Sequence, residues 1–178
     1  MAAGDIKLVY RGASLLVVTN LHSLAASTTR LGGWTSAVID NTIDRDIDKQ
    51  IIASFTSHAS NRSSTGSLEL WAYAMIDDST WPDIFSSGTE GTEGAATVHD
   101  AYRKSCALRL LWSVSPDATA SAVYVTPPLS VASAFDGLLP PKFALFVTGN
   151  ITTTTTAQLA SSGSQIAVRG VYENAASN

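Results

Sequence analysis

Short apolar runs, each bounded by Gly, Pro, Asn, Asp or Ser, recur along the whole of this 178-residue chain. The clearest run, over 68–76, alternates between two sets of side chains: Leu68, Leu70, Ala72, Ala74 and Ile76 on one side, and Glu69, Trp71, Tyr73 and Met75 on the other. A period of two is that of a β-strand, because successive side chains of a strand point to opposite faces. The pattern therefore predicts strands joined by loops.

Further strands are predicted where β-branched and aromatic residues gather in short runs. These runs are 6–10, 15–19, 34–39, 47–55, 107–114, 122–126, 143–148 and 165–172. The first two are expected to form a hairpin or two successive edge segments, and one short surface helix is expected within 97–105. About eight to ten strands without helices between them predict an all-β fold, a single-domain antiparallel β-sandwich of jelly-roll type over 1–178.

Three segments are expected to be irregular. The range 77–96 has glycines at 88, 91 and 94 and few apolar groups, which predicts a long exposed loop. The range 150–163 contains five consecutive threonines and is expected to be a second long loop or a projecting β-ribbon. The small polar residues of 174–178 predict a frayed tail.

The composition excludes several classes of protein. Charged residues make up 15% of the chain, below the roughly 25% of ordinary soluble domains. With 11 basic and 15 acidic residues, the chain has no excess of positive charge to neutralise phosphates, so nucleic-acid binding is not expected. The polar surface must come from hydroxyl groups, since 23 serines and 19 threonines are present. So little charge favours a protein that is covered by copies of itself or by a larger partner.

Cys106 is the single cysteine, which excludes a disulfide framework and a cysteine-based zinc site. Its place before an apolar strand predicts a small buried thiol. The first ten residues lack the basic and apolar regions of a signal peptide, and no apolar run approaches the roughly 18 residues of a membrane helix. We therefore expect a soluble protein that folds in a cytosol and has no membrane partner.

The acidic residues Asp44, Asp46 and Asp48 occupy alternate positions, as at the start of a calcium-binding loop. The rest of that loop is missing, because Lys49 stands where Gly is needed and Phe55 where a bidentate Glu is needed. We interpret the carboxylates instead as like charges along an extended segment, where they would resist pairing with stray strands. No metal or other cofactor is expected.

Catalytic motifs are not found either. His22, His58 and His99 stand apart from one another and from any metal-ligand spacing. The nucleophile elbow G-x-S-x-G is missing, and the glycines of 88–94 have glutamates between them, which would repel a phosphate. The sequence thus predicts a protein that is not an enzyme, with no catalytic or cofactor-binding residue.

Aromatic residues give the better functional indication. Trp71 and Tyr73 lie opposite the core side of the 68–76 strand, and Trp81 lies in a turn. Exposed Trp and Tyr on a β-sandwich suit sugar stacking or the anchors of a protein interface. In a two-sheet fold both faces of a strand can also be covered, so burial remains an equal alternative.

Five blocks resemble small head proteins of tailed bacteriophages of the capsid decoration, or cement, type: MAAGDIKLVY (1–10), WTSAVIDNT (34–42), DDSTWPDIF (77–85), VASAF (131–135) and PKFALFV (141–147). The resemblance implies a jelly-roll β-sandwich made in the host cytoplasm. It also implies a homo-oligomer, dimer or trimer, that sits on the virion exterior, binds the outer surface of the major capsid protein shell and stabilises the head. It carries over no site residue. The alternative is a carbohydrate- or receptor-binding module of a phage fibre.

The contacts with capsid protein and sister subunits are expected to come from the first strand, the acidic segment and the exposed aromatic side chains. These candidate interface residues are Ile6, Lys7, Leu8, Asp44, Asp46, Trp71, Tyr73 and Trp81.

Overall fold

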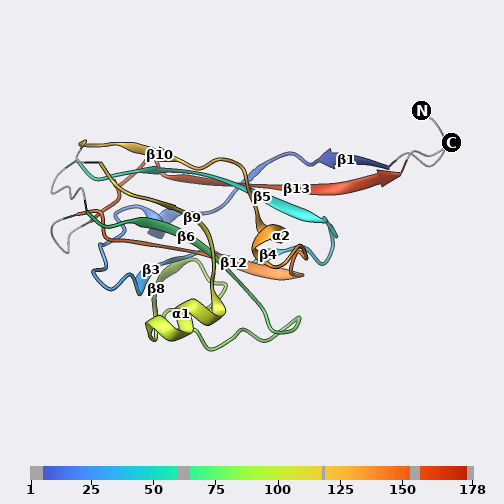
Figure 1. The fold of residues 1–178 in the computed structure, drawn as a ribbon, viewed down its shortest axis with the longest axis horizontal. Coiled ribbons are helices and arrows are strands. Elements are labelled where there is room, and N and C mark those ends of the chain that lie inside the picture. Colours follow the sequence, from blue (N-terminus) through green and yellow to red (C-terminus); the bar gives the residue numbers. More distant parts are fainter. Residues whose placement is uncertain (1–5, 60–64, 118, 153–156, 176–178) are drawn as a thin grey trace.

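Two antiparallel sheets pack face to face across an apolar core (Figure 1). The computed structural model describes residues 6–59, 65–117, 119–152 and 157–175. The predicted all-β sandwich is confirmed, since strands make up most of the regular structure and helices are few. The order of the strands determines which sheet faces and edges the rest of the described chain leaves uncovered.

One sheet, called sheet A here, contains the first and last strands of the chain. Its path is β1 (Ile6–Tyr10), β13 (Gln165–Ala175), β5 (Asp48–Thr56) and β10 (Val123–Val125). Two short strands attach to it, β2 (Ser14–Leu15) to β13 and β11 (Leu129–Ser130) to β5. β1 and β2 both pair with β13 and not with each other, so the chain has successive edge segments there rather than a hairpin.

The other sheet, sheet B, runs β7 (Phe85–Ser87), β8 (Gly94–Val98), β3 (Gly32–Thr35), β12 (Lys142–Gly149), β6 (Leu68–Ala74) and β9 (Arg109–Val114). A short strand, β4 (Ile39–Asp40), also pairs with β12. The described helices are η1 (Thr19–Leu21), α1 (Ala101–Ala107) and α2 (Val131–Ala134). Helix α1 overlaps the predicted surface helix and begins where the Asp100 side chain accepts a hydrogen bond from the Arg103 backbone.

Alternation places the main core between the sheets. On β5 the buried side chains are Ile51, Ala53 and Phe55. The inward face of β6 supplies Leu68, Leu70 and Ala72, as its alternation predicts. Phe55 stacks on Trp112 with ring centroids 5.9 Å apart.

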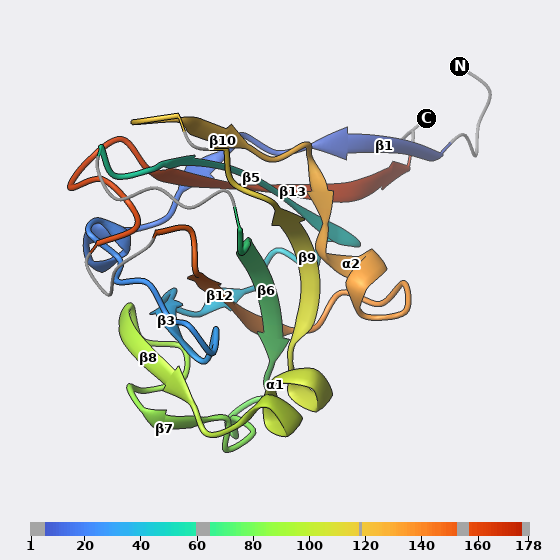
Figure 2. The same ribbon diagram turned by 60° about the vertical axis from the view of Figure 1, so that its left-hand side comes forward.

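The second face of sheet B is also covered, which the 68–76 pattern alone leaves open. Tyr73, Phe85 and Phe146 form a second apolar cluster there. Phe85 lies 5.5 Å from the Tyr73 ring and 5.6 Å from the Phe146 ring. Figure 2 shows β7, β8 and α1 gathered below β6 and β12, and buried residues of this region, Ile84 and Leu108, belong to the same cluster. Both faces of β6 are therefore largely buried.

The prediction of a long exposed loop over 77–96 is wrong in part, because β7 and the beginning of β8 lie within that range. Two glutamates fix the connecting turn. Glu90 accepts hydrogen bonds from the backbone nitrogens of Ile84 and Phe85, and Glu93 accepts one of 2.8 Å from the indole of Trp34. These carboxylates order a segment whose composition is typical of a solvated loop.

Three further expectations differ from the structure. The thiol of Cys106 is exposed on α1 instead of buried in a strand. Asn174 pairs with Lys7, so the expected frayed tail is wrong for 174 and 175, while 176–178 lie outside the described residues. Positions 153–156 of the expected loop over 150–163 lie outside the described residues. The flanking Ile151 and Leu159 are buried, so these flanking positions are not exposed as expected.

Candidate interaction surface

A two-stranded ribbon extends from one end of sheet A. It consists of β1 and residues 171–175 of β13, paired from Tyr10 with Val171 to Ile6 with Ala175. The next strand, β5, pairs with β13 only as far as Val171, opposite Asp48. Both views show this ribbon projecting beyond the rest of the sandwich (Figures 1 and 2). Beyond Val171 the ribbon therefore has only its two strands.

The ribbon presents apolar side chains to solvent. Ile6, Leu8 and Tyr10 are 65%, 60% and 53% exposed. They alternate along β1, so all three project from one face. Glu173 stands opposite Leu8 and belongs to the same face. The exposed members Ile6 and Leu8 agree with the candidate residues, and Tyr10 is a member that the sequence analysis missed.

The same face continues across sheet A. On β5 the inward residues are Ile51, Ala53 and Phe55, so Ile52 and its cross-strand partner Ala167 point outward. Leu15 is paired with Ala167 and extends this row. We call the outward, exposed or half-buried apolar set of this sheet the apolar outer face: Leu15, Val17, Ile52, Val123, Val125 and Ala167. No described element lies over it in either view (Figures 1 and 2).

An unpaired donor lies in the same face. Within the described residues, the Nε atom of Arg169 is the buried side-chain nitrogen without a hydrogen-bond partner. Arg169 pairs across the strands with Gln50 and shares the outward direction of Ala167, two residues earlier. An unsatisfied buried donor costs about 1–3 kcal/mol. Arg beside aliphatic and tyrosyl groups is typical of protein–protein contacts.

The acidic segment does not form the charged edge that its spacing predicts. Asp46 is buried and binds both Lys49 Nζ, at 2.6 Å, and Arg11 Nε, at 2.8 Å. Burial raises the pKa of Asp46, but the hydrogen bonds from Lys49 and Arg11 outweigh it and hold the pKa below its ordinary value. Asp44 remains exposed and binds Lys49 at 3.2 Å. Asp46 is a structural ion-pair residue, so it is removed from the candidate contacts.

The three aromatic candidates do not form a common platform. Tyr73 is fully buried, and its hydroxyl pairs with Thr35 Oγ1 at 2.6 Å and accepts from the Gly91 backbone at 3.0 Å. Burial raises the pKa of Tyr73 to about 12, against the opposing effect of these hydrogen bonds. The ring of Trp81 packs on Tyr73, with centroids 5.2 Å apart. The Tyr73 prediction is wrong, and sugar stacking on this face gains no support.

Trp71 belongs to a nearly buried ionic cluster between β6 and α1. Glu69 accepts hydrogen bonds from Lys104 Nζ at 2.7 Å, Arg30 Nη1 at 3.0 Å, Ser67 Oγ at 2.8 Å and Trp71 Nε1 at 2.9 Å. The Lys104 ammonium also lies 4.6 Å from the Trp71 ring centre. Each polar group that meets here has a partner, so the cluster fastens α1 to sheet B.

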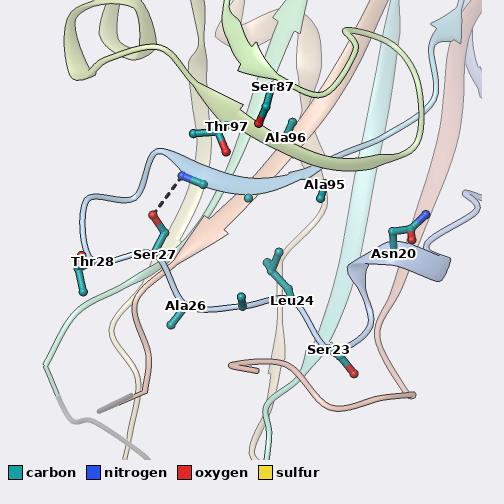
Figure 3. Close-up of a pocket in the computed structure, with 13 residues that line it drawn as sticks. Asn20, Ser23, Leu24, Ala26, Ser27, Thr28, Ser87, Ala95, Ala96 and Thr97 are labelled. Atoms are coloured by element: carbon teal, nitrogen blue, oxygen red, sulfur yellow. Dashed lines mark hydrogen bonds between the residues drawn. The ribbon is translucent and has the colours of Figure 1, made fainter. Parts of the chain in front are cut away.

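A groove of about 530 Å³ lies between the 23–28 segment and the β7–β8 pair, and Figure 3 shows the residues that line it. Small and hydroxyl side chains line it, among them Ser23, Ser27, Ser87 and Thr97. Ser27 Oγ already accepts a hydrogen bond of 3.1 Å from the Gly32 backbone. The groove has neither a charged side chain nor an aromatic platform, so it does not define a ligand class.

The described residues do not form a candidate metal site. Across 6–59, 65–117, 119–152 and 157–175, no group of three or more His, Cys, Asp or Glu side chains is placed to hold a metal ion. His22 Nε2 lies 3.2 Å from the Ser164 carbonyl oxygen, and His99 Nε2 lies 3.5 Å from the Asp83 carboxylate. The two histidines thus contact different segments of the chain. Among the same residues, no helix has the length and apolar character needed to span a membrane.

Comparison with known proteins gives no further identification. No family model, no curated protein and no solved structure matches this chain.

Proposed function

We propose that this chain is a structural protein of a phage virion that covers the outer surface of the major capsid protein shell and stabilises the head. The sequence blocks that resemble decoration proteins support this proposal. The observation that carries it in the structure is the apolar outer face of sheet A, which the described chain leaves open. Soluble monomers seldom leave so continuous an apolar face uncovered unless it is an interaction site.

The physical basis is mass action over many copies. Each subunit that binds the assembled shell and not its dissociated parts shifts the equilibrium toward the shell. A modest contact per copy is sufficient because the shell repeats it many times. On the apolar outer face, Leu15 and Val125 would supply buried apolar area.

We also propose that the sandwich is a variant of the jelly roll. The succession β3, β12, β6 and β9 in sheet B is that of one four-stranded jelly-roll sheet, and β10 beside β5 fits two strands of the other. The variation lies in β7 and β8, which join sheet B beyond β3 instead of sheet A. Sheet A instead extends on the other side of β5, through β13 and β1.

Capsid binding can be measured by sedimenting the purified chain with shells that lack it. We expect Leu15→Glu to weaken binding by at least about tenfold, because a carboxylate would be buried against the shell. Leu138→Glu is the matched control, since Leu138 is 78% exposed against 67% for Leu15 but lies on the loop after α2. The proposal is refuted if Leu15→Glu binds shells as well as the native chain does. It is also refuted if density for this chain is found on the tail of the virion and none on the head.

A further inference from the structure

We propose that two copies of this chain pair through the free edge of β1, antiparallel and centred on Leu8, so that sheet A continues from one copy into the other. This inference deepens the proposed function by giving the interface between sister subunits. It rests on the geometry of the ribbon and can be tested with the purified chain alone, without a capsid.

The backbone of β1 has three residues whose hydrogen-bonding groups face outward. The Arg11 backbone nitrogen donates to the Gly170 carbonyl at 2.9 Å, so position 11 points toward β13. In an antiparallel pair this direction alternates along the strand. Ile6, Leu8 and Tyr10 therefore direct their N–H and C=O groups away from β13. In the described sheet no strand pairs with that edge.

These outward groups complement a second copy of the same edge. With Leu8 opposite the partner copy's Leu8, Ile6 stands opposite the partner copy's Tyr10. All three outward residues then exchange hydrogen bonds in both directions, as in the hydrogen-bonded pairs of an antiparallel ladder. A shift of two positions either way leaves one of the three unpaired. The positions of the outward N–H and C=O groups therefore favour the register centred on Leu8.

The side chains suit the same register. Ile6, Leu8 and Tyr10 lie on one face, so each exposed apolar group would meet an apolar group of the partner. Lys7, on the other face, would stand opposite Val9 and not directly opposite a second lysine. No proline or bulge protects this edge, and Lys7 is its single charged residue. Native proteins generally block an exposed apolar edge unless it is used for pairing.

Access and size also fit a second copy. Because the ribbon projects from the sandwich, the bodies of two copies would lie on either side of the joined strands (Figure 2). A two-fold contact of this kind is the commonest form of oligomer. An edge of five residues is smaller than the 1,200–2,000 Å² of a standard stable interface. We therefore expect a reversible dimer, populated at about 100 μM and dissociated on dilution.

Cysteine cross-linking tests the register in a Cys106→Ser background, which removes the native exposed thiol. Leu8→Cys is expected to form a disulfide-linked dimer on mild oxidation with diamide, because opposed Cα atoms about 5.5 Å apart are within disulfide range. Ile6→Cys or Tyr10→Cys alone should remain monomeric, since each residue is then more than about 12 Å from its copy. A mixture of these two variants should form the linked dimer. Linking of each single variant as fast as Leu8→Cys would overturn the register.

Sedimentation equilibrium tests the pairing itself without covalent bonds. Leu8→Glu should weaken self-association by at least about tenfold, because two carboxylates would stand opposite each other at the axis. An equimolar mixture of Leu8→Glu and Leu8→Lys should restore it, whereas Leu15→Glu, off the ribbon, should associate as the native chain does. A native chain that remains monomeric at about 100 μM and above refutes the pairing. That result would leave the capsid-binding measurement unaffected, so failure of this inference is distinguishable from failure of the proposed function.

Discussion

Acidification should destabilise this protein chiefly through Glu69. Its carboxylate is nearly buried and accepts four hydrogen bonds, two of them from the cations Lys104 and Arg30. Burial by itself raises the pKa of Glu69, but the hydrogen bonds from Lys104, Ser67 and Trp71 and the charge of Lys104 outweigh it. They lower the pKa from an ordinary 4.5 to about 2. The carboxylate is thus bound more tightly to the folded chain than its protonated form is.

The difference between pKa 4.5 unfolded and about 2 folded corresponds to about 3 kcal/mol in the free energy of unfolding. Because the folded pKa is the lower one, this contribution is complete above pH 4.5 and is lost as the pH falls toward 2. Burial lowers the pKa of Lys104 even though Glu69 opposes that effect, so the cation offsets part of the gain at neutral pH. Glu69 contributes most to the acid limb of the stability curve, beside a smaller contribution from Asp46, whose pKa is also lowered. The Lys104 ammonium stays charged in that pH range.

Urea denaturation at pH 7, 5, 4 and 3 measures this dependence. Glu69→Gln should cost about 3–5 kcal/mol at pH 7, because the substitution leaves Lys104 as an uncompensated buried charge. It should also flatten the decline of stability between pH 5 and 3. Glu69→Gln combined with Lys104→Met should recover part of the loss, since both charges are then gone.

The control is Glu173→Gln, which removes an exposed carboxylate on the ribbon and should leave the decline unchanged. If Glu69→Gln loses stability with pH as steeply as the native chain, the explanation of the acid limb is wrong. A cost below about 1 kcal/mol at pH 7 would contradict the structural role of the cluster.

Three other variants test separate parts of the fold. Gly170→Ala should lower the free energy of unfolding by about 1–3 kcal/mol in thermal denaturation, because the added Cβ would lie directly against Asp46 Oδ2. Gly12→Ala is the control, since a Cβ at that position meets nothing within 4 Å. Tyr73→Phe should cost about 1–3 kcal/mol in urea denaturation because it leaves buried partners unpaired, and a loss below 0.5 kcal/mol would contradict that view. Cys106 should react with a thiol reagent in the folded protein at close to the rate of a free peptide thiol, and slow reaction until unfolding would show that the thiol is covered.

The main strands could be predicted because their signals are local. β6 and β5 carry alternating side chains over seven and nine residues, enough to establish a period of two. The helix α2 has four residues, little more than one turn, and so has no period that a sequence can reveal. Long strands in the sheet interior are therefore the predictable part of this fold.

The surroundings of each strand could not be predicted in the same way. Tyr73 alternates with core residues, which is consistent with either a solvent face or a second buried layer, and the burial depends on Phe85 and Phe146 from distant segments. Likewise, the role of Asp46 depends on Arg11, which approaches from another strand connection. Long-range partners such as these are set by the packing of the sheets and leave no local pattern.

The candidate interaction surface could be predicted only in part from the sequence. The alternation of Ile6, Leu8 and Tyr10 is visible in the sequence, but it is equally typical of a strand with one buried face. These residues are exposed because no described element covers the outer face of sheet A, which the sequence does not show.

The position of β13 in sheet A has a consequence for biosynthesis. β1 and β5 are not neighbours; each pairs with β13, which lies between them. During translation, β1 and β5 are made before β13, the strand that joins them. At 5–20 residues per second, the interval between the end of β5 and the end of β13 lasts about 6 to 24 seconds. Sheet B can assemble earlier, because β3, β6, β9 and β12 precede β13 in the chain. For that interval the inner side of β5 depends on sheet B or a chaperone for cover, so slower translation should lengthen the period in which the nascent chain is prone to aggregation.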